Sequence, residues 1–212
     1  METTVDKHSI KGGEFLIRET NCKEIFIAED FSEEQKMMAE ATQEFIKKEI
    51  IPNIDKIEKQ EDNIMPHLME KAGELGLLGI SIPEQYGGLG MNFNTSMLIA
   101  DKVGSTGSFS TAYGAHTGIG TLPILYYGTE EQRQKYLPLI TSGQWKSCYC
   151  LTEPDSGSDA NAGKTKAVLT EDGNHYLITG QKMWISNGGF ADMLIVFAKI
   201  DDDKKLTAFL VE

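Results

Sequence analysis

The sequence predicts an α+β protein in which a helical domain is followed by an antiparallel, barrel-like β domain. Apolar residues such as Met38, Ala41 and Phe45 recur every three or four positions, as on one face of a helix. After Trp145 the pattern changes to short runs rich in β-branched and aromatic residues, separated by turn sequences. Because helices and strands are segregated, an alternating βαβ design is excluded. We expect an N-terminal extension, a helical domain and an incomplete β domain, over residues 1–30, 31–143 and 144–212.

The helical domain contains four predicted helices, two of which begin with a capping box. Ser32 pairs with Gln35 in the first box, and Thr129 pairs with Gln132 in the second. Pro52 is expected to kink or divide the first helix because proline cannot donate the helical hydrogen bond. The four predicted helices cover residues 31–50, 65–79, 92–104 and 129–143.

The β domain contains six predicted strands. Cys148 and Cys150 should face one side of the first strand, and we interpret them as buried structural thiols. The last strand reaches Glu212 at the end of the sequence, so we expect further chain or another subunit to cover that edge. The predicted strands cover residues 147–152, 166–170, 175–180, 182–186, 193–200 and 206–212.

Composition and charge argue against several classes of protein. The net charge of −12 argues against nucleic-acid binding, which needs basic residues to displace counterions. The sequence has three cysteines, and no second pair of ligands at zinc-site spacing accompanies Cys148 and Cys150. We therefore expect no metal site. The longest wholly apolar run, residues 193–198, is far short of the ~20 residues of a membrane span. The first 15 residues lack a signal core and an arginine-rich amphipathic helix, so we expect a cytoplasmic protein.

Three local patterns invite functional readings that the sequence does not support. The stretch "SDANAGKT" (residues 158–165) approaches a phosphate-binding loop, but it begins with Ser158 and is followed by a predicted strand. The stretch "YGGLG" (residues 86–90) lacks the spacing of a dinucleotide fingerprint and is interpreted as a link between helices. His116 has no partner motif of a catalytic nucleophile, so we expect a packed helix residue.

Four ordered segments resemble the acyl-CoA dehydrogenase family, with the very-long-chain branch closest in appearance. The stretch "CLTEPDSGSDANA" fits the family signature at every position, and "KMWISNGG" resembles the tryptophan-containing strand of the family. The stretches "IPEQYGGLG" and "YGTEEQRQKYLP" resemble its helical domain. The resemblance covers nearly the whole chain from about Phe31 and implies that a C-terminal helical domain, absent from this chain, follows in the family.

The resemblance implies that FAD binds between the helical and β domains. Leu151 and Thr152 would offer backbone N–H groups to the flavin, and the Thr152 hydroxyl would add a further hydrogen bond. Trp184 would lie against the flavin rings, and Ser186 would hydrogen-bond near the flavin N5 atom. Ser158 would reach the CoA part of the substrate or the phosphates of the cofactor. The implied FAD-binding residues are Tyr149, Leu151, Thr152, Ser158, Trp184, Ile185 and Ser186.

The substrate implied by the resemblance is an acyl-CoA thioester. At helical spacing, Thr111, Ala115 and Ile119 share one face, and together with Ser158 they are the implied substrate-binding residues. Small side chains at Thr111 and Ala115 leave room for a long acyl chain. The alternative is that these small residues only allow close packing of helices.

The implied reaction is the α,β-dehydrogenation of the acyl group in fatty-acid β-oxidation. In the family, the carboxylate that removes the α-proton lies in the C-terminal helical domain, so no catalytic residue is assigned in this chain, which is expected to be inactive alone. The resemblance further implies electron-transfer flavoprotein as the electron acceptor and a homo-oligomer for the full-length protein. An acyl-CoA oxidase and a non-enzymatic binding protein on the same scaffold stay open as alternatives.

Overall fold

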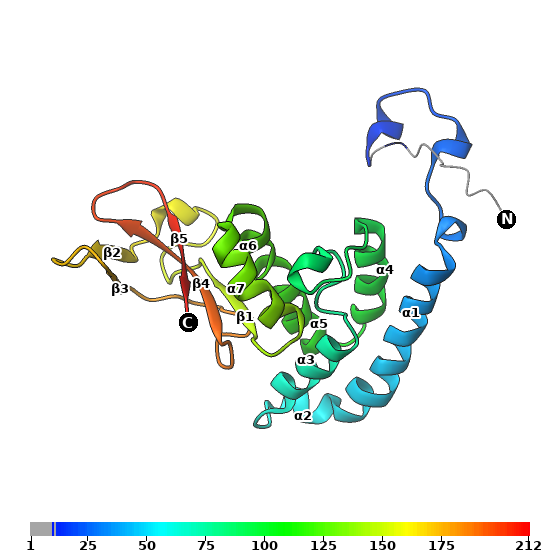
Figure 1. Cartoon of the computed structure of the whole chain (residues 1–212), viewed down its shortest axis with the longest axis horizontal. Helices are drawn as coiled ribbons and strands as arrows, with labels where there is room; N and C mark the ends of the chain where they lie inside the picture. The colour runs from blue at the N-terminus through cyan, green and yellow to red at the C-terminus, as the bar shows by residue number, and fades with distance from the viewer. Residues whose placement is uncertain (1–9, 11) are drawn as a thin grey trace.

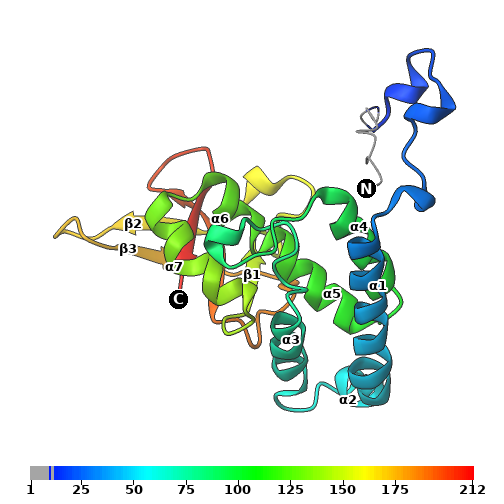
Figure 2. The same ribbon diagram turned by 45° about the vertical axis from the view of Figure 1, so that its right-hand side comes forward.

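A computed structural model describes residue 10 and residues 12–212, in which helices form one end of the molecule and a sheet the other (Figure 1). In both views the β2–β3 hairpin (β2, Lys166–Leu169; β3, Tyr176–Thr179) lies at the end far from helix α1 (Glu33–Phe45) (Figure 2). The described part of the expected N-terminal extension contains three short 3-10 turns and leads away from α1. Residues 1–9 and 11, which include most of the segment searched for a targeting signal, lie outside the described residues.

The first predicted helix is confirmed, together with its capping box. The Ser32 hydroxyl accepts from the Gln35 N–H, and the Gln35 side-chain oxygen accepts from the Ser32 N–H. Pro52 divides the helix as expected: α1 passes through a π turn and a 3-10 turn before α2 begins. These three segments are the π turn Ile46–Ile50, the 3-10 turn Ile51–Asn53 and α2, Ile54–Glu58.

The other three predicted helices are also confirmed, and two further helices lie between them. Helix α3 (Ile64–Glu74) ends just before Gly76, whose φ of 74° is the left-handed conformation that glycine adopts at helix ends. Helix α7 begins with the predicted box, in which Thr129 and Gln132 exchange hydrogen bonds. The remaining helices are α4, Phe93–Val103; α5, Ser108–Gly114, which continues into a π turn, Ala115–Ile119; α6, Leu122–Tyr127; and α7, Glu130–Thr141.

The sheet is mixed and open, so the expected antiparallel barrel is wrong in these two details. Strand β4 (Met193–Ile200) pairs in parallel with β1 (Ser147–Cys150) and with β2, whereas β5 (Thr207–Val211) pairs with it antiparallel. The strand order is β1-β4-β2-β3, with β5 on β4. Period-2 patterns identify strands but carry no information on their relative direction, because a parallel and an antiparallel strand bury the same alternate residues.

Five of the six predicted strands are present, and the predicted strand over residues 182–186 is not. This segment is irregular, and its Met183 N–H donates to the Thr152 carbonyl over 2.9 Å. Trp184 has a φ of 60°, a left-handed conformation that an extended strand does not contain. The run of apolar residues therefore reflects a constrained loop beside β1 and not a strand.

Two apolar clusters hold the chain together. One lies among the helices, where Phe109, Leu68 and Ile99 are fully buried. The other joins helix α7 to the sheet through Leu137 and Met193, both of which are inaccessible to solvent. Burial of each such side chain stabilises the fold by about 1.5–3 kcal/mol. The second cluster therefore holds the helical part in a fixed position against the sheet.

Candidate functional site

A cleft of about 780 Å³ opens where the helices meet the loop before β4. Its walls are the segment from α2 to α3 (residues 57–66), the start of α5 and the turn formed by residues 185–190. The volume falls within the range of small-molecule sites, roughly 300–1,000 Å³. The cleft brings together Thr111 from one predicted set of residues and Ile185 and Ser186 from the other.

The two other predicted acyl-site residues do not line this cleft. Ala115 is buried, whereas Ile119 is half exposed to solvent. The regular helix expected here is interrupted, because α5 continues into the π turn Ala115–Ile119. Nothing in the sequence marked this turn as different from the rest of the helix.

The predicted flavin residues on β1 lie at an open edge of the sheet. The Ser147 N–H points away from β4 and donates to His116. Because N–H groups two residues apart in a strand point the same way, that of Tyr149 faces this edge as well, whereas Leu151 and Thr152 follow the end of β1. The Tyr149 ring packs on the Phe197 ring, with 4.8 Å between the ring centroids.

Trp184 lies beside this edge with 85% of its surface exposed, which is unusual for an indole. The hydrogen bond from Met183 to Thr152 holds the tryptophan-containing loop against the end of β1. An exposed aromatic ring, a hydroxyl at Ser186 and an open strand edge thus lie on neighbouring segments. This combination of donors and an apolar surface fits a flat ring system such as a flavin.

Ser158 is exposed in the loop after β1 and does not line the cleft. The loop is closed by the Ser156 hydroxyl, which donates to the Asp159 carbonyl over 2.8 Å. Strand β2 follows it, as expected, so this loop does not lead into the helix that a nucleotide-binding phosphate loop requires.

A buried ion pair between Glu153 and Lys182 joins the two segments that carry the predicted flavin residues. The Lys182 ammonium donates to a Glu153 oxygen over 2.8 Å and to the Leu151 carbonyl over 3.0 Å. Glu153 also accepts the backbone N–H groups of Lys164 and Thr165. Burial by itself raises the pKa of Glu153, but these hydrogen bonds outweigh it and lower the pKa to about 2. Local sequence patterns do not reveal this pair, because its members are 29 residues apart.

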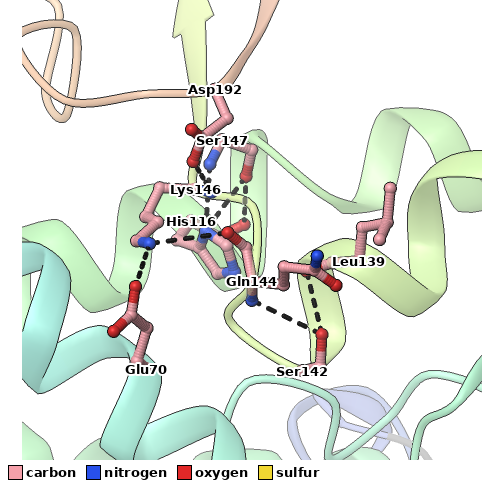
Figure 3. Close-up of polar contacts among 8 residues, drawn as sticks. All are labelled: Glu70, His116, Leu139, Ser142, Gln144, Lys146, Ser147 and Asp192. Carbon is pink, nitrogen blue, oxygen red and sulfur yellow. Dashed lines mark hydrogen bonds and ion pairs between the residues drawn. The ribbon is translucent and has the colours of Figure 1, made fainter.

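His116 links the π turn to β1 (Figure 3) and also to α7. Its Nε2 lies 3.0 Å from the Ile140 carbonyl and therefore carries the hydrogen, which leaves Nδ1 to accept the Ser147 N–H over 3.1 Å. Burial, with a smaller contribution from the nearby charge of Lys146, lowers the pKa of His116 to about 4. The ring is thus neutral at pH 7, which confirms a packed helix residue and adds a structural role.

Lys146, next to this histidine, is almost fully buried and is held at both ends (Figure 3). Its ammonium donates to Glu70 of α3 over 2.6 Å, and its backbone N–H donates to the Asp192 carboxylate over 2.8 Å. Lys146 thereby ties helix α3 and the residue preceding β4 to the start of β1.

The cysteine prediction is confirmed for the strand: Cys148 and Cys150 are buried on one side of β1, with 3.6 Å between their sulfur atoms. Within residue 10 and residues 12–212, no group of three or more histidine, cysteine, aspartate or glutamate side chains is arranged to hold a metal ion. No helix in this described part of the chain has the length and apolar character needed to cross a membrane.

Comparison with known proteins identifies the class to which this fold and site belong. Residues 32–144 match the family model described as the acyl-CoA dehydrogenase N-terminal domain, and residues 148–212 match that of the middle domain. The chain therefore belongs to the acyl-CoA dehydrogenase family.

Individual relatives agree with this assignment. The chain is 51% identical over 202 residues to a probable acyl-CoA dehydrogenase of Bacillus subtilis. The aligned region covers 95% of this chain and 34% of that protein. It is 43% identical over 167 residues to the mitochondrial very long-chain specific acyl-CoA dehydrogenase of Mus musculus, covering 74% of this chain and 25% of that protein. The chain thus spans about a third or less of the length of these curated relatives.

A solved structure of the same family also resembles this chain. The acyl-CoA dehydrogenase from Bacillus anthracis, complexed with FAD, superposes with a TM-score of 0.91 at 48% sequence identity. The match covers 96% of this chain and 35% of that one.

Proposed function

We propose that this chain is the N-terminal and middle part of an FAD-dependent acyl-CoA dehydrogenase that acts on long-chain acyl-CoA in fatty-acid oxidation. The observation that carries the proposal is the cleft that brings Thr111 of α5 together with Ile185 and Ser186 of the turn formed by residues 185–190. In this proposal the wall that bears Thr111 (the acyl wall) contacts the acyl chain, and the wall that bears Ile185 and Ser186 (the flavin wall) contacts the flavin. The FAD-bound relative from Bacillus anthracis and the very-long-chain relative from mouse support the cofactor and the substrate class, respectively.

The residues of the chain have separate tasks in this proposal. When bound, FAD supplies the hydride-accepting chemistry of the reaction. The Leu151 N–H and the Thr152 hydroxyl, just after β1, would donate to the pyrimidine side of the flavin, where preorganised donors stabilise negative charge. Trp184 would cover the ring system, Ser186 would donate near N5, and Ser158 would bind a phosphate of CoA or of the cofactor.

The remaining features of the proposal rest on the family resemblance and on the sequence. The carboxylate that removes the α-proton belongs to a C-terminal helical domain, so we assign no catalytic residue in this chain. Electron-transfer flavoprotein is the proposed acceptor, and the complete protein is proposed to be a cytoplasmic homo-oligomer. In an oxidase, the alternative within the same class, the reduced protein would be reoxidised rapidly by molecular oxygen.

The proposal is tested with the complete protein and two variants. We expect the purified protein to be yellow and its flavin absorbance to bleach when long-chain acyl-CoA is added without oxygen. Trp184→Ala should weaken FAD binding without lowering thermal stability of the apoprotein, because the indole is exposed and its removal opens no cavity in the core. Ser186→Ala should shift the flavin midpoint potential by an amount equivalent to the net free energy of one hydrogen bond, about 0.5–1.5 kcal/mol.

A protein that contains no flavin, or one whose flavin stays oxidised with every acyl-CoA tested, contradicts the proposed function. If Trp184→Ala and Ser186→Ala leave both FAD affinity and potential unchanged, the function stands but these two residues do not belong to the flavin site.

The acyl-chain preference depends on the open space beside Thr111. Ala115 is buried and does not line the cleft, so Thr111→Phe is the substitution that fills it. We expect Thr111→Phe to lose long acyl chains while retaining short ones, at about 0.8 kcal/mol for each methylene no longer buried. Values of kcat/KM over a series of chain lengths measure this. Thr179→Phe on the exposed strand β3 is the matched control. A profile that Thr111→Phe does not change would show that the acyl chain runs elsewhere.

A further inference from the structure

The turn formed by residues 185–190 carries one wall of the cleft, and Asn187 is its buried residue. Asn187 is 7% exposed, whereas its neighbours Ser186 and Gly188 are exposed. Its φ of 69° lies in the left-handed region, which asparagine tolerates better than most residues. The turn therefore points a single amide side chain into the protein.

The Asn187 amide nitrogen donates two hydrogen bonds to different parts of the fold. One goes to the Ala112 carbonyl of α5 over 3.0 Å, and the other goes to the Ser147 carbonyl of β1 over 3.2 Å. Ala112 lines the cleft next to Thr111. A single side chain thus joins the wall that bears Ser186 to the wall that bears Thr111.

The β1 end of this connection is itself fixed. The Ser147 N–H donates to His116 (Figure 3), and the other ring nitrogen of His116 donates to the Ile140 carbonyl of α7. Lys146, the preceding residue, is bound to Asp192 just before β4. Asn187 therefore attaches the turn to a backbone that neighbouring elements already hold in place.

We propose that Asn187 is a positioning residue that sets the separation between the flavin wall and the acyl wall of the cleft. This inference rests on the proposed function. Reacting atoms must approach to about 3–3.5 Å, and a misplacement of about 1 Å can cost on the order of 100-fold in rate. Asn187 touches neither substrate nor cofactor in this proposal; it acts through Ser186 on one side and Ala112 on the other.

The test compares two variants of the complete protein with wild type. Asn187→Gly removes the amide and keeps the left-handed backbone without strain. Asn187→Asp keeps the shape but cannot donate when ionised, and it decides the question if the glycine variant does not fold. Asn174→Gly, the same substitution in the exposed β2–β3 turn, is the control.

We expect both Asn187 variants to retain FAD affinity within about threefold, because the flavin donors at Leu151, Thr152 and Ser186 remain. The rate of flavin reduction in a single turnover should fall at least about tenfold, since two hydrogen bonds that fix the geometry are lost. In the apoprotein, hydrogen exchange should accelerate at the amides of residues 186–190 and stay unchanged at β4. The Asn174→Gly control should match wild type in all three measurements.

An unchanged reduction rate in the variants overturns the inference. So does a loss of FAD affinity and thermal stability that accounts for the whole loss of rate, because Asn187 would then only stabilise the fold. If wild type itself binds no flavin or is not reduced by acyl-CoA, the proposed function fails first, and this result is distinct from either outcome in the variants.

Discussion

Replacing Lys182 by methionine is expected to lower the free energy of unfolding by about 3–5 kcal/mol, the cost of leaving one member of a buried ion pair without its partner. The Glu153 and Lys182 side chains are only 6% and 12% exposed, so water cannot replace the lost ammonium. Glu153 would retain the backbone N–H groups of Lys164 and Thr165, but its charge would be uncompensated. Urea denaturation of wild type and variant measures the difference.

A surface ion pair offers the matched control. Lys164 pairs with Asp155 over 2.8 Å, but both side chains are more than 70% exposed. Lys164→Met should therefore change stability little, because an exposed pair is screened by water and salt. The double variant Glu153→Gln with Lys182→Met should be less destabilised than the sum of the single changes, because it removes both charges together. Equal losses for Lys182→Met and Lys164→Met would show that burial of the first pair carries no weight.

The pair has a consequence for the flavin site as well. Lys182 binds the Leu151 carbonyl, and Met183 binds the neighbouring Thr152 carbonyl, so the loop that carries Trp184 is fastened to the edge of β1. Loss of the ammonium should loosen both segments together. FAD affinity of the complete protein is therefore expected to fall in Lys182→Met and to be largely restored in Lys182→Arg, which keeps the positive charge.

The helices were predictable because their signals are local. The capping boxes at Ser32 and Thr129 lie within four residues each, and the structure forms both. The break at Pro52 follows from the chemistry of one residue. Burial of Cys148 and Cys150 on one side of β1 follows from the period of a strand.

The direction of the strands and the loop around Trp184 could not be predicted in this way. Both depend on contacts between distant residues: β1 pairs with β4, 46 positions later in the sequence, and the Trp184 loop is held by Thr152 and Glu153. The apolar run in "KMWIS" has the composition of a strand, but its backbone is set by those tertiary contacts. Residue composition alone does not distinguish the two cases.

The candidate site was predicted in part. The resemblance supplied Thr111, Ile185 and Ser186, and the structure places these three on one cleft. It did not supply Asn187, whose hydrogen-bond partners lie 40 and 75 residues away. The π turn from Ala115 also escaped prediction, because its sequence has no feature that separates it from an α-helix. Roles of the named residues in binding FAD or acyl-CoA stay predictions.

Acid is expected to destabilise the protein through His116, and His116→Gln should remove that contribution. Burial lowers the pKa of His116 from 6.5 to about 4, so between these values the unfolded chain binds a proton that the folded chain does not. Stability from this residue is therefore complete above about pH 6.5 and is lost as the pH falls toward 4. At 1.36 kcal/mol per pKa unit, the loss reaches about 3 kcal/mol.

Urea denaturation at several pH values, compared between wild type and His116→Gln, isolates this effect, because carboxylates that titrate in the same range are common to both proteins and cancel in the difference. Glutamine has no charge to gain, and its amide offers both a donor for the Ile140 carbonyl and an acceptor for the Ser147 N–H. His175→Gln in the exposed β2–β3 turn should keep the acid dependence of wild type. If His116→Gln loses stability in acid in parallel with wild type, the buried imidazole is not the group that takes up the proton, and the link from α7 through His116 to β1 does not depend on its neutral state.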